Sequence, residues 1–170
     1  MNGQVPRHGW ESIITDRLSA MGHRNWIVVA DSAYPKQVAA GVETVPTGED
    51  HFLVLKTVLD AISAAEHVRP IVHLDAELQY LGEDDAPGIE AFREDLAQQL
   101  KGQDVQSHSH EEIIGKLDEA GKSFHVLLLK SNLTLPYTTV FLQLDCGYWS
   151  AEAEQNLRRS MEIALSPETE

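Results

Sequence analysis

The spacing of apolar residues along the chain alternates between the periods of helices and strands. Apolar residues recur at helical spacing over Trp10–Met21, and Gly22 supplies a C-terminal stop. The next apolar run, Trp26–Ala30, is short, continuous and rich in β-branched residues. Such a run predicts a strand that is buried on both faces of an α/β sheet.

The same alternation of patterns continues to the end of the chain. Asp50 is suited to cap a helix whose apolar face runs from Phe52 to Ile62. Pro70–Leu78 alternates strictly and predicts a strand with one polar face. Further strands are predicted at Val42–Val45, Val105–Ser109, Phe124–Leu129 and Thr138–Leu144. Further helices are predicted at Ile89–Leu100, Glu111–Ala120 and Ala151–Leu165.

These elements predict one α/β domain, in which helices flank a mixed β-sheet. The length of 170 residues agrees with a single domain. We expect a flexible lead-in at residues 1–9, the domain itself at residues 10–149, and a helical extension at residues 150–170. In that extension the pattern predicts Leu157 and Met161, with Ile163 or Leu165, on the inward side of the helix.

Composition and charge exclude several classes of protein. Hydrophobic residues make up 42% of the chain and charged residues 24%, which is ordinary for a folded domain and excludes global disorder. The net charge of −14 repels phosphate backbones and anionic membrane surfaces, so neither nucleic acid nor a membrane is an expected partner. No apolar run is long enough for a bilayer, and the first ten residues have no signal-peptide core. We therefore expect a cytoplasmic protein that meets neutral small molecules or a metal cation.

Searches for short catalytic motifs find none of the common ones. The chain has no GxGxxG after a strand, no Walker A loop, no GxSxG elbow and no CxxC pair. Its single cysteine, Cys146, follows an apolar strand and is expected to be an inert small hydrophobe.

One candidate pair flanks the predicted strand Trp26–Ala30. His23 precedes that strand and Asp31 follows it. At about 3.3 Å per residue, a straight strand separates the two side chains by about 25 Å, so they cannot meet directly. Without further information, His23 is a turn residue and Asp31 caps a loop.

A second candidate group is the polar face of the alternating strand, formed by His73, Asp75 and Glu77. Nitrogen and oxygen ligands on alternate positions can bind a divalent metal such as zinc, and His108 adds a further nitrogen. The alternative is a strand face that meets solvent or a subunit boundary.

A third candidate is Tyr137, which follows Pro136 before an apolar strand. It is either a packing anchor or a phenol that binds a sugar-like hydroxyl.

Taken in order, these segments resemble the D-ribose pyranase / L-fucose mutarotase (RbsD/FucU) family. The helix ending in Gly22-His23, the apolar strand, Asp31 and Pro35 are similar to the family's opening motif. Ser109-His110-Glu111 resembles the later Thr-His-Glu element of the ribose branch, and Pro136-Tyr137 resembles the tyrosine segment before the last apolar strand. The resemblance spans about residues 10–147.

This resemblance implies an RbsD-like three-layer α/β fold and a ring-like homo-oligomer with sugar sites between neighbouring subunits. It also implies a mutarotase or pyranase that interconverts the anomers or ring forms of a neutral monosaccharide, and we expect no cofactor. Opening and closing a hemiacetal needs one group to remove a proton and another to donate one. We expect His23 to be the principal acid or base, with Asp31 orienting it or binding a hydroxyl. The remaining expected site residues are His110 and Tyr137, for the opposite proton or for hydroxyls, and Thr139 and Tyr34, for substrate contact.

The sequence departs from the family pattern at two positions near this site. Thr139 stands where the family has asparagine, and Ile114 stands where the ribose branch has lysine. A relative that binds a monosaccharide without turning it over is therefore the first alternative. A metal-dependent isomerase or hydrolase built on His73, Asp75 and Glu77 is the second, and a plain oligomeric scaffold is the third.

Overall fold

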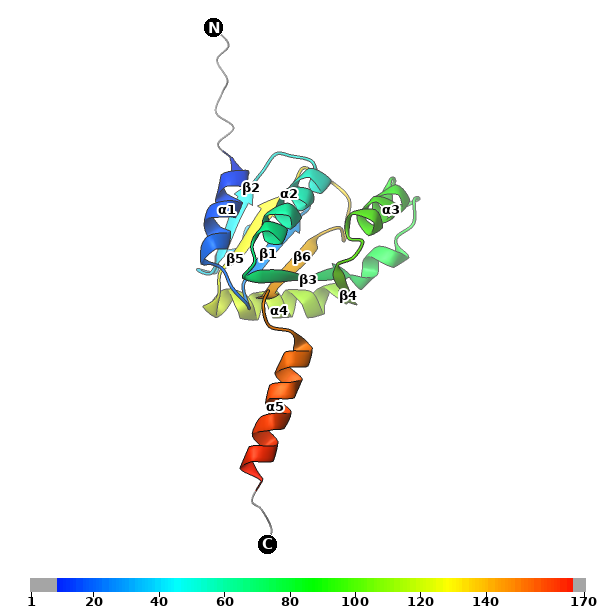
Figure 1. The fold of residues 1–170 in the computed structure, drawn as a ribbon. Coiled ribbons are helices and arrows are strands. Elements are labelled where there is room, and N and C mark those ends of the chain that lie inside the picture. Colours follow the sequence, from blue (N-terminus) through cyan, green and yellow to red (C-terminus); the bar gives the residue numbers. More distant parts are fainter. Residues whose placement is uncertain (1–8, 167–170) are drawn as a thin grey trace.

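A computed structural model describes residues 9–166 of the chain, which form a six-stranded sheet with helices on both faces (Figure 1). The strands follow the order β2-β5-β1-β6-β3-β4 across the sheet. They are β1 (Trp26–Ala30), β2 (Val42–Pro46), β3 (Val68–Asp75), β4 (Asp104–His108), β5 (Val126–Lys130) and β6 (Val140–Cys146). The helices are α1 (Trp10–Ala20), α2 (His51–Ala64), α3 (Ile89–Gln99), α4 (His110–Ser123) and α5 (Ala151–Leu165), with the short 3-10 helix η1 (Ala76–Tyr80) after β3. The predicted single-domain α/β fold with a mixed sheet is confirmed. Most of the predicted lead-in at residues 1–9 lies outside the described residues.

Two apolar layers enclose the sheet, which gives the three-layer architecture. Helices α1, α2 and α3 pack on one face together with Ile27 and Val29 of β1, whereas α4 packs on the other face with Val28. Figure 1 shows α1 and α2 in front of the sheet and α4 behind it. All five residues of β1 are buried because the strand lies inside the sheet with a layer on each side. This burial explains why its sequence is continuously apolar instead of alternating.

Only β6 runs against the direction of its neighbours. It pairs antiparallel with β1 and with β3, whereas the pairs β1–β5, β2–β5 and β3–β4 are parallel. The carboxyl ends of the five other strands therefore lie along one edge of the sheet, and β6 begins at that same edge. Loops from distant parts of the sequence meet there.

The prediction of a strand over Pro70–Leu78 with an exposed polar face is wrong in both bounds and in the exposure of that face. Strand β3 begins at Val68 and ends at Asp75, and Glu77 lies in η1, so Glu77 does not share a strand face with the other two polar residues. His73 and Asp75 are each only 2% exposed. The reason is tertiary: β3 lies between β6 and β4, and the His73 ring packs against the ring of Trp26 on β1.

Helix α5 has the predicted bounds but not the predicted inward face. It extends away from the sheet in Figure 1, and none of its residues is buried. Leu157 and Met161 are partly exposed, and Ile163 and Leu165 are largely exposed. The expectation that these side chains turn inward is wrong, because no other element of the described chain packs along the helix. The acidic turn Glu83–Asp85 is exposed.

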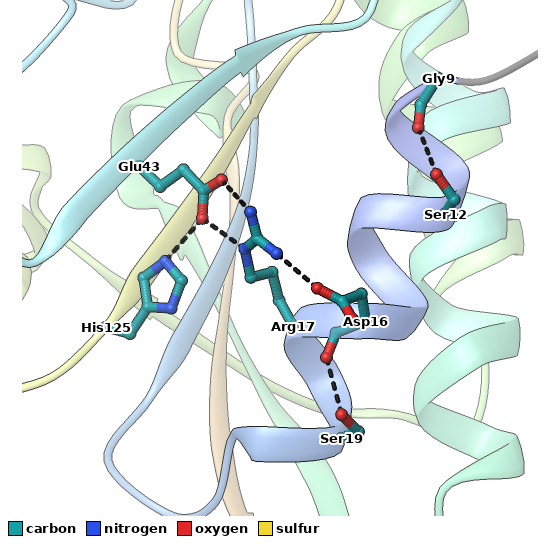
Figure 2. Close-up of polar contacts among 7 residues, drawn as sticks. All are labelled: Gly9, Ser12, Asp16, Arg17, Ser19, Glu43 and His125. Atoms are coloured by element: carbon teal, nitrogen blue, oxygen red, sulfur yellow. Dashed lines mark hydrogen bonds and ion pairs between the residues drawn. The ribbon is translucent and has the colours of Figure 1, made fainter.

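A bidentate ion pair ties α1 to the edge strand β2 (Figure 2). The Arg17 guanidinium donates from Nε and Nη2 to the two carboxylate oxygens of Glu43, each at 2.9 Å. His125, before β5, approaches the same carboxylate at 3.0 Å. The hydrogen bonds from Arg17 are the main reason that the pKa of Glu43 lies below its usual range. This fork geometry fixes the direction of α1 on the sheet.

Gly41, just before β2, lies where a side chain has no room. A Cβ atom at this position would lie 2.3 Å from the backbone oxygen of Gly121 and 2.6 Å from that of Phe124. We expect Gly41→Ala to destabilise the fold by about 1–3 kcal/mol, because backbone atoms at the end of α4 would have to move. Urea unfolding of both variants measures this, with Gly115→Ala as the matched control.

In the control, a Cβ at Gly115 meets no atom within 4 Å, and the residue lies inside α4. Alanine there should stabilise the protein by about 0.5–1 kcal/mol through helix propensity. Equal midpoints for the two variants would contradict the close packing of Gly41.

Of the described helices, none combines the length and the apolar character that crossing a membrane requires.

Candidate functional site

Polar side chains from four segments gather at the carboxyl edge of the sheet. Asp31 follows β1, Asp75 ends β3, His110 begins α4, and Tyr137 lies in the loop before β6. The sheet topology places these segments together, although they are up to about 100 residues apart in sequence.

Asp31 and Thr139 form the first pair of this edge. Val29 is the register partner of Val140, so the residues just beyond, on β1 and before β6, also lie side by side. The Thr139 hydroxyl donates to Asp31 Oδ1 at 3.2 Å, and the Ala33 amide donates to Asp31 Oδ2 at 3.3 Å. Thr139 is 3% exposed, so its hydroxyl serves the carboxylate and orients it.

His110 and Asp75 form the second pair. His110 Nδ1 lies 3.0 Å from Asp75 Oδ1, and the backbone amide of His110 donates to both carboxylate oxygens of Glu77, at 3.1 and 3.0 Å. The Asp75 side chain is 1% exposed and that of His110 is 33% exposed. Burial raises the pKa of Asp75, and the hydrogen bond from His110 opposes that shift. The imidazole therefore lies at the surface against a buried acceptor.

Tyr137 links the two pairs. Its ring lies edge-on to the His110 ring, with centroids 5.6 Å apart, and the side chain is 41% exposed. Its φ of 56° lies in the left-handed region, which a residue with a side chain adopts only when its surroundings hold it there. Thr139 follows two residues later and reaches Asp31. One short loop thus brings a phenol beside the imidazole and a hydroxyl beside the carboxylate.

Within one copy of the protein, His23 lies far from Asp31, His110 and Tyr137. It is exposed and lies between α1 and β1, at the opposite edge of the sheet from Asp31. The next residue, Arg24, also has a positive φ, of 74°, and its amide donates to the Leu144 oxygen at 3.1 Å. The expected separation of His23 and Asp31 by the length of β1 is therefore observed within one chain.

Tyr34, predicted to contact substrate, lies inside the protein. It is 5% exposed and packs against Phe141 of β6, with ring centroids 6.3 Å apart. Burial is the main cause that raises the pKa of its phenol far above the usual value, with Asp118, Asp75 and Asp31 as weaker causes. Tyr34 thus lies beneath the edge and not on it.

The residues of the metal alternative have other partners. His73 Nε2 lies 2.9 Å from Gln143 Oε1, Asp75 binds His110, and Glu77 accepts the His110 amide. The ring of His108 packs against that of His73, at 5.4 Å between centroids. Within residues 9–166, no three histidine, cysteine or acidic side chains are arranged so that they could hold a metal ion.

His51 is a residue of this region that the sequence did not single out. It begins α2, is 1% exposed, and its Nδ1 lies 2.8 Å from the Ser131 hydroxyl, which in turn contacts the Ala30 oxygen at 3.0 Å. Burial is the main cause that lowers the pKa of His51 to about 4. It therefore joins α2 to the ends of β5 and β1, near enough to Asp31 for that carboxylate to oppose the shift weakly. A histidine after a helix cap has no periodicity that would indicate this role.

The fold and the polar edge together define an α/β protein with a cluster of polar side chains at the carboxyl ends of a mixed six-stranded sheet. No family model matches the sequence, and no curated protein is similar to it in sequence. Solved structures do share the fold, at low sequence identity, and two of them are described as sugar complexes.

Bacillus subtilis RbsD complexed with D-ribose aligns with a TM-score of 0.56 at 17% identity, over 85% of this chain and 96% of that chain. The fucose mutarotase from Streptococcus pneumoniae in complex with L-fucose aligns with a TM-score of 0.53 at 17% identity, over 85% and 98%. FucU from Bifidobacterium longum aligns with a TM-score of 0.50 at 14% identity, over 79% and 94%. The resemblance inferred from the motifs is therefore confirmed at the level of the fold.

Proposed function

We propose that the protein is a monosaccharide mutarotase or pyranase, which interconverts the anomers or ring forms of a neutral sugar. The observation that carries the proposal is the surface imidazole of His110, held by buried Asp75 and flanked by the Tyr137 phenol. The fold supports it, because RbsD is described with D-ribose and the pneumococcal enzyme as a fucose mutarotase with L-fucose. Carboxylates at this edge favour an uncharged polyol over a phosphorylated one.

The chemistry requires two proton transfers. His110 removes the proton of the anomeric hydroxyl as the bond between C1 and the ring oxygen breaks, and the electron pair of that bond goes to the ring oxygen. A second acid protonates the ring oxygen, which leaves the open-chain aldehyde. Reclosure on the other face of the carbonyl reverses both transfers. Histidines suit both roles near neutral pH.

In this proposal the second acid is His23 of a neighbouring copy. His23 and Asp31 lie at opposite ends of β1, so His23 can reach the carboxyl edge only from another chain. A homo-oligomer with sites between subunits provides that arrangement. Tyr137 and Asp31 then bind sugar hydroxyls, Thr139 orients Asp31, and Tyr34 supports the edge from beneath.

A binding protein without turnover is the second candidate, and one observation favours it. Ile114, which stands where the ribose branch has lysine, packs against the apolar cluster between α4 and the sheet. The site therefore lacks a cation at that position. Such a protein would bind the sugar without accelerating the exchange of its anomers.

The test is saturation-transfer NMR of anomer exchange in D-ribose and L-fucose. The protein should accelerate exchange of at least one of these sugars, and Tyr137→Phe should slow that exchange about 10-fold, because one hydrogen bond to the sugar is lost. Tyr148→Phe is the matched control, because Tyr148 is 79% exposed and lies outside the site.

The two candidate functions give different spectra. Sugar-dependent shifts of protein signals without faster exchange would select the binding protein. Neither shifts nor exchange with either sugar would overturn the proposal for these two substrates, and wild-type exchange in Tyr137→Phe would remove the phenol from the site.

A further inference from the structure

Asp75 is buried at the end of β3, and among the described residues its carboxylate is hydrogen-bonded to the His110 ring. It is 2% exposed, its Oδ1 lies 3.0 Å from His110 Nδ1, and its Oδ2 has no hydrogen-bond partner among the described residues. A buried carboxylate is costly unless a donor satisfies it. The contact with His110 satisfies one oxygen of this carboxylate, Oδ1.

The backbone of His110 is held by a second carboxylate from the same segment. Glu77, two residues after Asp75, accepts the His110 amide with both oxygens. Asp75 thus holds the side chain of His110 while Glu77 holds its main chain at the first turn of α4. The imidazole has little freedom to rotate or to move away from β3.

We propose that Asp75 is a positioning residue that fixes His110 as the tautomer with its proton on Nδ1. An ionised carboxylate only accepts hydrogen bonds, so the nitrogen that faces it must carry the hydrogen. A neutral imidazole then has its lone pair on Nε2, and that nitrogen takes the sugar proton. The carboxylate also stabilises the imidazolium that forms. The inference rests on the proposed function for the role of Nε2, but the tautomer itself does not depend on it.

Other charged or titratable groups face this pair from the neighbouring elements. They include Glu77 on η1, Asp31 after β1, Tyr137 before β6, and the buried Tyr34. None of these side chains is within hydrogen-bond distance of the His110 ring in the described contacts, whereas Asp75 is. Asp75 is therefore the group that selects the tautomer.

Nitrogen-15 NMR of the histidine rings tests the proposal in the sugar-free protein near neutral pH. His110 signals, assigned by their loss in His110→Ala, should show a protonated Nδ1 and an unprotonated Nε2. Asp75→Asn, whose amide can donate to Nδ1, should shift the population towards the Nε2–H tautomer. Asp104→Asn is the matched control, because Asp104 is an exposed carboxylate on the adjacent strand β4.

Kinetics give a second readout. Asp75→Asn should lower the maximal exchange rate about 10²-fold, through lost orientation of His110, with little change in the sugar concentration at half-saturation. Asp75→Glu should recover part of this loss. An Nε2–H tautomer in the wild type, or an unchanged tautomer in folded Asp75→Asn, would overturn the inference. A wild type without exchange activity would overturn the proposed function alone, since the NMR result is obtained without sugar.

Discussion

Replacing His110 by alanine is expected to slow anomer exchange by a factor of about 10²–10⁴, the usual contribution of one positioned proton transfer. The replacement also removes the donor to the buried Asp75 carboxylate, so the variant should lose about 1–3 kcal/mol of stability as well. The bond from the backbone amide of residue 110 to Glu77 remains, and the rate is compared under conditions where both proteins are folded. Saturation-transfer NMR measures the rate, and urea unfolding checks stability. His108→Ala is the control, since His108 lies two residues away and pairs with Glu112.

Mixing two inactive variants tests whether the site lies between subunits. His23→Ala and His110→Ala chains, unfolded together and refolded, should recover about a quarter of wild-type activity if His23 and His110 come from neighbouring copies. Each site then has a chance of about one half of receiving each intact histidine. No recovery from a mixture that assembles normally would refute the contribution of His23 across subunits.

Acidification is expected to unfold the protein at a higher pH than the protonation of its carboxylates alone would, because of the buried His51. In the unfolded chain His51 takes a proton near its ordinary pKa of 6.5, whereas in the folded protein burial lowers the pKa to about 4. Between these values the unfolded state binds more protons, so stability is fully present above pH 6.5 and declines as the pH falls towards 4. The total loss from this residue is about 3 kcal/mol.

Comparison with His51→Asn isolates this contribution from that of all other groups. Asparagine keeps a polar atom near the Ser131 hydroxyl and does not titrate. The unfolding free energies of wild type and variant are measured from pH 8 to pH 4. The stability of the wild type relative to the variant should be greatest at high pH and should fall below pH 6.5. A difference that stays constant over this range would contradict a buried, uncharged His51.

Most of the elements could be predicted from the sequence, because periodicity follows directly from burial. The strand Trp26–Ala30 and the helix Ala151–Leu165 have the predicted bounds, and Asp50 caps α2 through bonds to the amides of Phe52 and Leu53. The predicted strand Pro70–Leu78 shows the limit of this reasoning. Alternation of apolar and polar residues looks the same whether the polar side chains meet water or partners inside the protein, and here His73 and Asp75 meet partners.

The candidate site was only partly visible in the sequence. Motifs indicated Asp31, His110 and Tyr137, but they gave Asp75 only as a metal ligand and did not include His51. Asp75 acts through His110, which is 35 residues away in the sequence, and His51 acts through Ser131, which is 80 residues away. No local pattern records such partners.

The sequence by itself determined where most of the helices and strands lie and which side chains are able to move protons. The tertiary structure decided which of those side chains meet. One antiparallel strand, β6, inserted between β1 and β3, places its leading residues Tyr137 and Thr139 beside the carboxyl ends of its neighbours. It also leaves His23 at the far end of β1. The physical reason is that hydrogen-bonded strand order depends on the packing of the whole sheet, whereas periodicity depends only on each strand's own two faces.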